Sequence, residues 1–301
     1  MPRVAIVTGG TSGIGRALSA ALVRRGDTVV LTGTDGAAAA RVAEQVAAGG
    51  PGAASGAELD VRDAAAVGGL VAGTASRYGR LDLLFNNAGV GIGGRIEELS
   101  LAHWDRAVDV NLRGVVHGVH AAYPVMVRQG AGHIVNTASV AGLLPNPGFA
   151  PYAMTKWGVV GLSLALRGEA ASHGVRVTVV CPGGVDTPML DRGMPPDLPR
   201  LPSVEAIDVR TVIRKLNGGR LHDADDLAAD VLRGVDRNRP IVVAPRQARI
   251  AWRLMRLSPS LFLRLSQVLA ARDPDLRSAT GVAAPATGEL PGRRLSGGRE
   301  R

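Results

Sequence analysis

Short apolar runs alternate along this chain with longer segments in which hydrophobic residues recur every three or four positions. The short runs are rich in Val, Ile and Leu, which is typical of strands buried on both faces, and the longer segments predict helices. The alternation predicts an α/β fold, a doubly wound parallel sheet of Rossmann type with about seven strands and helices on both faces. The predicted strands are 4–8, 28–31, 57–60, 81–85, 133–136, 176–180 and 241–244. The predicted helices are near 14–25, 36–48, 63–77, 101–129, 152–172 and 224–236.

Some segments do not follow this alternation. The Gly- and Ala-rich stretch 47–57 is expected to be a surface connection. Residues 183–222 are rich in proline and show no clear period, so we expect a long irregular loop of the kind that is usually functional or mobile. Two short helices are predicted at 247–257 and 260–271, and 273–301 has a composition typical of disorder. The chain thus divides into one domain at 1–246, a basic helical segment at 247–272 and a tail at 273–301.

Composition excludes several classes of protein. The single Cys181 rules out an intramolecular disulfide framework, and the scattered histidines suggest no metal site. There is no secretory leader and no apolar run of membrane-spanning length, so a cytoplasmic enzyme is expected. The net charge is +9, but the six arginines and absent acids of residues 240–272 account for most of it. This local basic patch is weak evidence for nucleic-acid binding, which we do not expect.

The sequence TGGTSGIG at 8–15 follows the first predicted strand and opens the first predicted helix. Gly9, Gly13 and Gly15 allow a tight turn and a close approach of a pyrophosphate, while the helix N-terminus offers free N–H groups. An ordinary strand–helix turn is the alternative for this motif alone, and its position after a first strand favours the nucleotide site.

Tyr152 and Lys156 lie four residues apart, so a helix places both side chains on one face. Only two lysines occur in this Arg-rich chain, at 156 and 215. A nearby ammonium lowers the pKa of a phenol, which brings Tyr152 closer to use as an acid and base at neutral pH. Lys also differs from Arg in the shape of its donor group, so the two residues are not interchangeable here. Composition bias is the other explanation for a stray lysine.

These motifs, with DVNLRG at 109–114, the NNAG motif at 86–89, IVNTASVAG at 134–142 and PGGVDTP at 182–188, resemble the short-chain dehydrogenase/reductase family in order and spacing. The resemblance covers residues 3–245. It implies an oxidoreductase that interconverts a ketone or aldehyde and an alcohol with NAD(P). The catalytic residues that it implies are Asn111, Ser139, Tyr152 and Lys156. The cofactor-binding residues that it implies are Gly9, Thr11, Ser12, Gly13, Ile14, Gly15, Gly33, Thr34, Asp60, Val61, Asn87, Ala88, Gly89, Tyr152, Lys156, Pro182, Gly183, Val185 and Thr187.

The resemblance also implies a role for each catalytic residue. Tyr152 gives a proton to the carbonyl oxygen during reduction and takes the alcohol proton during oxidation. Ser139 holds the substrate oxygen beside Tyr152, and Lys156 binds the hydroxyls of the cofactor ribose. Asn111 bends or interrupts its helix and holds a water that links Lys156 to solvent.

The end of the second strand decides the cofactor in this family. An acid at this point binds the ribose 2′-hydroxyl of NAD, and here Gly33 takes its place. Thr34 stands where many NADP-dependent relatives carry Arg. Arg16 could approach a 2′-phosphate or cover the helix surface, and Asp35 could reach the ribose or cap the next helix. We expect NADP(H), with NAD(H) as the alternative.

The substrate pocket is expected after Ser139, around 146–149 and after Pro188. Its predicted lining is mostly apolar: Val140, Leu143, Leu144, Phe149, Met189 and Leu190, unless these residues are simply core. A hydrophobic small-molecule ketone or alcohol fits best. The family also implies a homo-oligomer, a dimer or tetramer. The alternatives to a carbonyl oxidoreductase are a redox-neutral or C=C-reducing member of the family and a non-catalytic nucleotide-binding regulatory protein.

The basic segment 247–272 has two interpretations. Arg249, Arg253 and Arg256 share one face of the predicted helix, and Ile250, Leu254, Leu257 and Leu261 share an adjoining one. Such a helix can lie on an anionic membrane surface. Alternatively, it packs its apolar face over the substrate loop or a neighbouring subunit and leaves the arginines in water.

Overall fold

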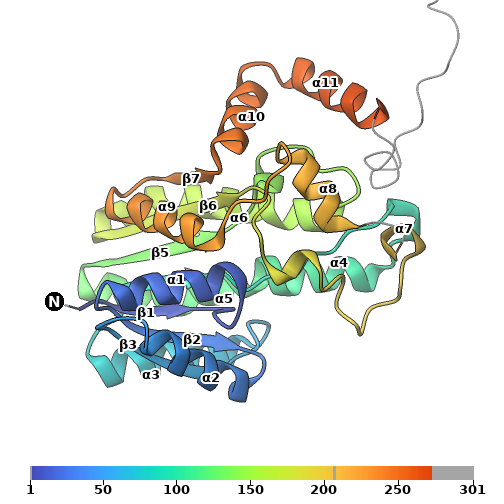
Figure 1. Ribbon diagram of the computed structural model, residues 1–301. Coiled ribbons are helices and arrows are strands. Elements are labelled where there is room, and N and C mark those ends of the chain that lie inside the picture. Colours follow the sequence, from blue (N-terminus) through green and yellow to red (C-terminus); the bar gives the residue numbers. More distant parts are fainter. Residues whose placement is uncertain (1, 206–207, 273–301) are drawn as a thin grey trace, which may run out of the picture.

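A single parallel sheet forms the centre of the molecule (Figure 1). The computed structural model describes residues 2–205 and 208–272. Seven strands lie in the order β3-β2-β1-β4-β5-β6-β7, which confirms the predicted doubly wound α/β fold. The strands are β1 Val4–Val7, β2 Thr28–Gly33, β3 Ala53–Glu58, β4 Leu83–Asn86, β5 Gly132–Thr137, β6 Val175–Pro182 and β7 Ile241–Ala244.

Both faces of the sheet are covered by helices. The principal helices are α1 Gly13–Arg24, α2 Gly36–Ala47, α3 Ala64–Tyr78, α4 Leu101–Val108, α5 Gly114–Gln129, α6 Ala150–Ala170, α8 Val209–Leu216, α9 Ala224–Asp236, α10 Arg246–Leu257 and α11 Pro259–Arg272. Alternate residues of each central strand point to opposite faces. Ala5 and Val7 of β1 join a core with α1, α2 and α9, whereas Ile6 joins a second core with α3, α5 and α6. Every residue of β1 is therefore buried, as its continuous apolar pattern predicts.

The chain reverses its direction of winding between β1 and β4. Strands β2 and β3 lie on one side of β1, and β4 to β7 lie on the other. The loops that follow β1 and β4 diverge at this switch point, which leaves a crevice at the carboxyl ends of the strands. The glycine motif follows β1 and the NNAG motif follows β4, so the fold brings both to the same crevice.

Both ends of the third strand differ from the sequence prediction. The third strand begins at Ala53, inside the stretch expected to be a surface connection, and ends at Glu58 instead of continuing to Asp60. Its sequence, AASGAE, lacks an apolar run because β3 is an edge strand and is mostly half-buried. Small residues are required here because a Cβ on Gly56 would lie 2.3 Å from the backbone of Ala39 in α2.

The prediction of an irregular loop over 183–222 is wrong in part. The stretch contains the short helix α7 Pro202–Glu205 and the helix α8 Val209–Leu216. Asp208 caps α8 by accepting a hydrogen bond from Thr211 N at 3.0 Å, and Val212 is buried beneath it. The short element is stabilised by its cap and its buried face together.

The helices α10 and α11 follow β7 and form an arm that extends from the body of the protein (Figure 1). No helix in the described part of the chain is long and apolar enough to span a membrane. The predicted disordered tail, 273–301, lies outside the described residues, so that prediction stays untested.

Candidate active site

The glycine motif forms a narrow turn between β1 and α1. Gly9 and Gly13 adopt positive φ angles of 64° and 50°, which other residues adopt only with strain. A Cβ on Gly9 would lie 2.8 Å from Ala88 Cα. Ser12 is the N-cap residue of α1, and the first N–H groups of any helix have no partner within it. The half-buried Thr11, Ser12 and Ile14 and the buried Gly15 complete a turn that fits the close approach of a pyrophosphate.

The NNAG segment is held against this turn by hydrogen bonds. Asn87 Nδ2 donates to the carbonyl oxygens of Thr8 at 3.1 Å and Gly9 at 3.3 Å. Thr8 Oγ1 accepts from the backbone N–H groups of Asn87 and Ala88 at 2.9 and 3.1 Å. The two loops therefore form one rigid unit, with Gly89 beside Asn111 and Lys156.

The residues around the end of β2 would surround an adenosine. Gly33 packs against Thr11, whose Cγ2 lies 2.7 Å from the position of a Gly33 Cβ, and Thr34 is exposed. Asp35 caps α2 by accepting from Ala38 N at 2.9 Å, which is the second of the two roles that the sequence allowed. Arg16 donates to Gln45 of α2 at 3.2 Å and so lies along the helix surface.

The opposite side of the expected adenine site carries Asp60 and Val61. Asp60 lies two residues beyond β3 and pairs with Arg62, which keeps the pKa of the carboxyl below its ordinary value. Val61 is buried against Gly114, and its carbonyl oxygen accepts a hydrogen bond from His117 Nδ1 at 2.9 Å. No motif in the sequence indicates the Arg62 and His117 contacts.

Asn111 lies in a π-helical turn, Asp109–Arg113, between α4 and α5. The single helix predicted for 101–129 is therefore interrupted at the position implied by the family resemblance. The Asn111 side chain is fully buried, and its Oδ1 accepts from Val90 N at 2.8 Å while its Nδ2 donates to Val90 O at 3.0 Å. This pair fixes the loop after the NNAG motif. The Oδ1 also lies 3.1 Å from where a Gly89 Cβ would be, so a larger residue there would press on the Asn111 side chain.

Ser139 and Tyr152 approach each other from β5 and α6. Ser139 caps a short 3₁₀ turn, and its Oγ accepts from Ala141 N at 3.1 Å. Burial raises the pKa of the Tyr152 phenol above its ordinary value of 10.0, and a hydrogen bond with Ser139 opposes that rise. Tyr152 therefore stays protonated at neutral pH in the protein alone, ready to act as a proton donor.

Lys156 lies beneath the tyrosine ring. Its Nζ is 5.5 Å from the centre of the Tyr152 ring and donates to Thr137 O at 2.9 Å. Only 3% of Lys156 is exposed, and this burial lowers its pKa from 10.5 to about 8. Nearby, burial raises the pKa of the Cys181 thiol to about 12, so the ammonium is the charged group of this pair at pH 7. Asn111, Ser139, Tyr152 and Lys156 thus gather at one end of the sheet.

The segment after β6 closes the crevice over the glycine turn. Gly183 N donates to Ala244 O at 2.7 Å, and Val185 is buried. The side chain of Thr187 lies 3.1 Å from the position of a Gly13 Cβ, so the segment reaches the phosphate turn. Pro182 ends β6, and its carbonyl oxygen lies 3.5 Å from Ser139 Oγ.

Arg210 of α8 was missed by the sequence analysis. Its guanidinium pairs with Asp186 and Asp191 at 2.6 Å each and donates to the Thr187 carbonyl at 3.3 Å. It therefore joins α8 to the segment that borders the cofactor crevice. No motif marked it, because its partners lie about 20 residues away in a stretch without a regular pattern.

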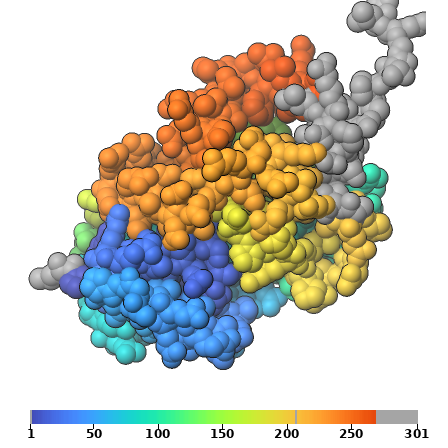
Figure 2. Space-filling view, in the orientation of Figure 1, coloured from blue at the N-terminus to red at the C-terminus, as the bar shows by residue number. Residues whose placement is uncertain are grey.

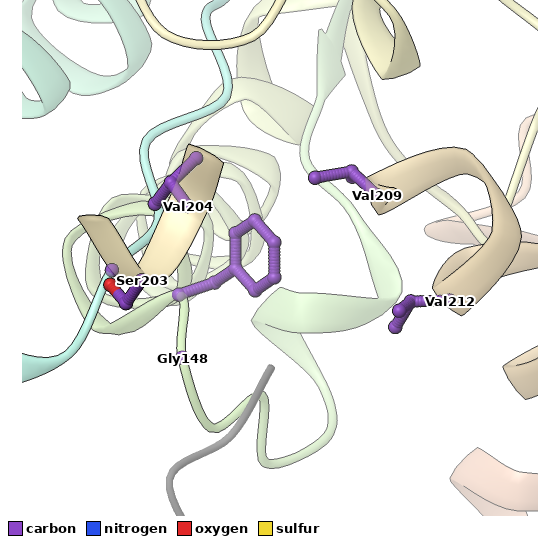
Figure 3. Close-up of a pocket in the computed structure, with 7 residues that line it drawn as sticks. Gly148, Ser203, Val204, Val209 and Val212 are labelled. Carbon is purple, nitrogen blue, oxygen red and sulfur yellow. The ribbon is translucent and has the colours of Figure 1, made fainter. Parts of the chain in front are cut away.

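A small pocket lies between the loop after β4, the residues just before α6 and the helices α7 and α8 (Figure 3). Gly94, Gly148, Phe149, Ser203, Val204, Val209 and Val212 line it. Its cavity volume is about 20 Å³, which is room for one water. Of the predicted pocket residues, Phe149 lines this pocket, whereas Leu143 is packed in the core with Val159 and Cys181. Val140 and Leu144 pack at the edge of that core, and Met189 is exposed.

The glycine turn is well suited to the phosphate of a nucleotide. The turn at Gly9 leaves no space for a side chain, and the N-terminus of α1 points into the crevice. Residues 2–205 and 208–272 contain no group of three His, Cys, Asp or Glu side chains that could hold a metal ion.

Comparisons with known proteins agree with this geometry. The sequence model of the family described as "short chain dehydrogenase" matches residues 3–195. A D-beta-hydroxybutyrate dehydrogenase of Rhizobium meliloti is 36% identical over 196 residues, which are 65% of this chain and 76% of the relative. A short-chain dehydrogenase/reductase of Burkholderia phymatum, solved with NAD, has a TM-score of 0.77 and 34% identity and covers 86% of this chain and 95% of its own. A short-chain dehydrogenase of Sphingobium yanoikuyae, solved with NADPH, has a TM-score of 0.72 and 25% identity, covering 88% and 95%.

Proposed function

This chain belongs to the short-chain dehydrogenase family, and from that premise we propose that it interconverts a ketone or aldehyde and an alcohol on a hydrophobic small molecule, with Tyr152 as general acid and base. It is an oxidoreductase that acts on CH–OH and C=O groups, and a nicotinamide cofactor is supported by the solved relatives that hold NAD and NADPH. The single observation that carries the proposal is the gathering of Ser139, Tyr152 and Lys156, with Nζ 5.5 Å from the phenol ring.

The chemistry of each residue follows from its surroundings. The cofactor, when bound, supplies or accepts a hydride at the substrate carbon. Tyr152 is protonated at neutral pH and gives its proton to the carbonyl oxygen during reduction. The Lys156 ammonium stabilises the phenolate that remains, and it holds the ribose hydroxyls. Ser139 orients the substrate oxygen, and Asn111 anchors the loop at Val90 and, we propose, a water that links Lys156 to solvent.

We propose NADP(H) as the preferred cofactor. A carboxylate at Gly33 would repel a 2′-phosphate, and none is there. Asp35 is occupied as the cap of α2. One negative charge near this site opposes the binding of a 2′-phosphate, that of the exposed Glu58. Glu58 pairs with Gly33 in the β2–β3 register, and its Oε2 lies 3.0 Å from the position of a Gly36 Cβ.

Two substitutions test the cofactor preference in opposite directions. Gly33→Asp is expected to shift preference toward NADH, because its carboxylate repels the 2′-phosphate. Glu58→Gln is expected to tighten NADPH binding without tightening NADH binding. The dissociation constants of both cofactors would be measured by fluorescence titration for each protein. Equal affinities of the wild type for the two cofactors, or unchanged NADPH binding by Gly33→Asp, would contradict the assignment.

The apolar pocket supports a hydrophobic substrate. Phe149, Val204, Val209 and Val212 contribute its apolar surface, and α7 and α8 border it (Figure 3). Its present volume of about 20 Å³ holds no organic substrate, so we propose that α7 and α8 move apart when substrate enters. A screen of hydrophobic ketones and alcohols should follow NADPH absorbance together with product formation. Product formed without any change in the cofactor would indicate a redox-neutral reaction instead.

We also propose a homo-oligomer that assembles through α5 and α6. Met154, Trp157 and Leu164 are 45%, 48% and 41% exposed and share one face of α6 with Gly161 and Gly168. Such a flat apolar face suits a second copy of the same helix. Light scattering of the purified protein would reveal a monomer if this proposal were wrong.

A further inference from the structure

The arm formed by α10 and α11 is attached to the body through one side of α10. Ala248 is buried, and Ala251, Trp252 and Met255 are half-buried. These positions recur at i, i+3, i+4 and i+7, so they lie on one face of the helix. Arg249 adds hydrogen bonds to the Val243 carbonyl at 3.1 and 3.2 Å. These contacts fix the orientation of α10, and therefore which of its residues face outward.

A stripe of large apolar side chains lies on the outward side of α10. Ile250, Leu254 and Leu257 are 47%, 54% and 82% exposed and recur at i, i+4 and i+7. They lie roughly opposite the residues that pack on the body. The expectation that this apolar face covers the substrate loop is therefore wrong, since other residues of α10 make the contacts with the body.

The second helix repeats the pattern. Leu261, Leu265 and Val268 of α11 are 56%, 54% and 47% exposed and again recur at i, i+4 and i+7, while Phe262 and Ser266 are half-buried. We call these six residues, three on each helix, the arm stripe. Exposed apolar side chains that occur singly are ordinary, but six of them at helical spacing on two successive helices indicate an interaction surface.

All charged residues of the arm are arginines, so its charge is positive. Residues 240–272 contain six arginines and no acid, whereas the net charge of the whole chain is +9. Arg246, Arg253 and Arg264 are exposed and flank the stripe, and Arg256 stacks on Trp252 with its guanidinium carbon 5.3 Å from the ring centre. The occupant of this surface must accept apolar side chains and supply negative charge beside them.

We propose that the arm stripe docks on an anionic lipid surface, with the arginines at the phosphate headgroups. An amphipathic helix of this composition lies in the plane of the interface, with its apolar side chains among the acyl chains. Anionic headgroups attract the arginines. The arm stands at one extremity of the molecule, in Figures 1 and 2, so a flat surface can reach it.

A second copy of this chain fits the arm less well than lipid does. In a symmetric contact the same patch meets itself, so the exposed Arg246, Arg253 and Arg264 would meet the same residues of the second copy, with no acid in residues 240–272 to pair with them. That arrangement opposes association through like-charge repulsion. The apolar face of α6 at Met154, Trp157 and Leu164 lacks this charge and is the better surface for self-association.

The test uses the full-length protein and flotation with vesicles. Binding is expected to vesicles of phosphatidylcholine mixed with phosphatidylglycerol, to be weak with phosphatidylcholine alone, and to fall as salt rises. The double variant Leu254→Ser, Leu257→Ser should weaken binding by on the order of tenfold or more, since two side chains no longer leave water. Its matched control is Ile96→Ser, Leu101→Ser, which alters two residues that are 66% and 78% exposed elsewhere on the surface.

A second pair of variants separates charge from apolar contact. Arg253→Gln, Arg264→Gln should weaken binding to anionic vesicles, whereas Arg128→Gln, Arg237→Gln removes the same charge from exposed positions outside the arm and should have little effect. Circular dichroism verifies that each variant is folded, and light scattering reports its oligomeric state.

The inference is overturned if the folded protein does not bind anionic vesicles, or if the arm and control variants lose binding equally. It is also overturned if the Leu254→Ser, Leu257→Ser variant changes the oligomeric state while vesicle binding is absent, because the arm would then be a subunit contact. None of these results depends on turnover, so failure of the proposed reaction would leave the test intact.

Discussion

The buried ammonium of Lys156 predicts a pH dependence of stability that can be calculated. Burial lowers its pKa from 10.5 to about 8 in the folded protein. Between these two values the unfolded chain keeps a proton that the folded protein has released. The unfolded state therefore binds more protons, and the stability contributed by this group rises with pH. Well below pH 8 both states are protonated, and the contribution is constant.

The magnitude follows from the two pKa values. Between pH 7 and pH 10 the folded protein should gain about 2.5 kcal/mol of unfolding free energy from this group alone, at about 1.4 kcal/mol per pH unit in the middle of the range. Replacing the lysine by Lys156→Met removes the titration. The difference in unfolding free energy between wild type and variant should therefore change by about 2.5 kcal/mol over this range.

Equilibrium unfolding in urea, followed by circular dichroism at several pH values, measures this difference. Cys181 and Tyr152 also have raised pKa values, and the Lys156 charge lowers the pKa of the Cys181 thiol. Up to pH 10 the folded thiol and phenol stay mostly protonated with or without that charge, so their effects largely cancel in the comparison. Lys215→Met, at the only other lysine and an exposed one, is the matched control and should follow the wild type. A wild type and Lys156→Met that stay parallel from pH 7 to pH 10 would refute the buried ammonium.

The other predictions concern the cofactor crevice. Arg210→Gln removes two partly exposed ion pairs and should weaken cofactor binding by about threefold to tenfold, with less effect on kcat. The control is Arg200→Gln, which removes an ion pair of α7. Equal cofactor affinity in the two variants would contradict the role of Arg210. Gly9→Ala should cost about 2–5 kcal/mol of stability through backbone strain and a 2.8 Å contact, and should abolish cofactor binding. Gly26 shares the positive φ but has open space around it among the described atoms, so Gly26→Ala should cost about 1–2 kcal/mol of stability and keep cofactor affinity. Equal losses of stability and of cofactor affinity in the two glycine variants would refute the close approach of the cofactor to Gly9.

The sheet could be predicted from the sequence because its central strands are buried on both faces and therefore continuously apolar. The edge strand β3 was placed too late for the opposite reason, since AASGAE resembles a loop when only one face is covered. The helix α8 carries a usable signal that was overlooked. Val209, Val212, Ile213 and Leu216 follow a helical repeat after the cap Asp208, and the surrounding prolines obscured it.

Tyr152 and Lys156 could be proposed from their spacing on a helix, and Ser139 and Asn111 from the resemblance of their short motifs to those of the family. The contacts that position them could not. Arg210 binds the segment after β6, and Asn111 bonds to Val90. Both contacts depend on which distant segments the fold brings together. Likewise, the basic helix at 247–272 was evident from its pattern, but only the packing of Ala248 and Trp252 reveals which apolar side chains face outward.

The most direct test of the central claim is single-turnover reduction of a hydrophobic ketone by the NADPH-loaded protein, comparing wild type with Tyr152→Phe. A missing general acid costs roughly 10²–10⁴-fold in rate. The variant should lose turnover by about that factor while binding NADPH with nearly unchanged affinity, and Tyr123→Phe on α5 should behave as wild type. Near-normal turnover in Tyr152→Phe would contradict the assignment of Tyr152 as the proton donor.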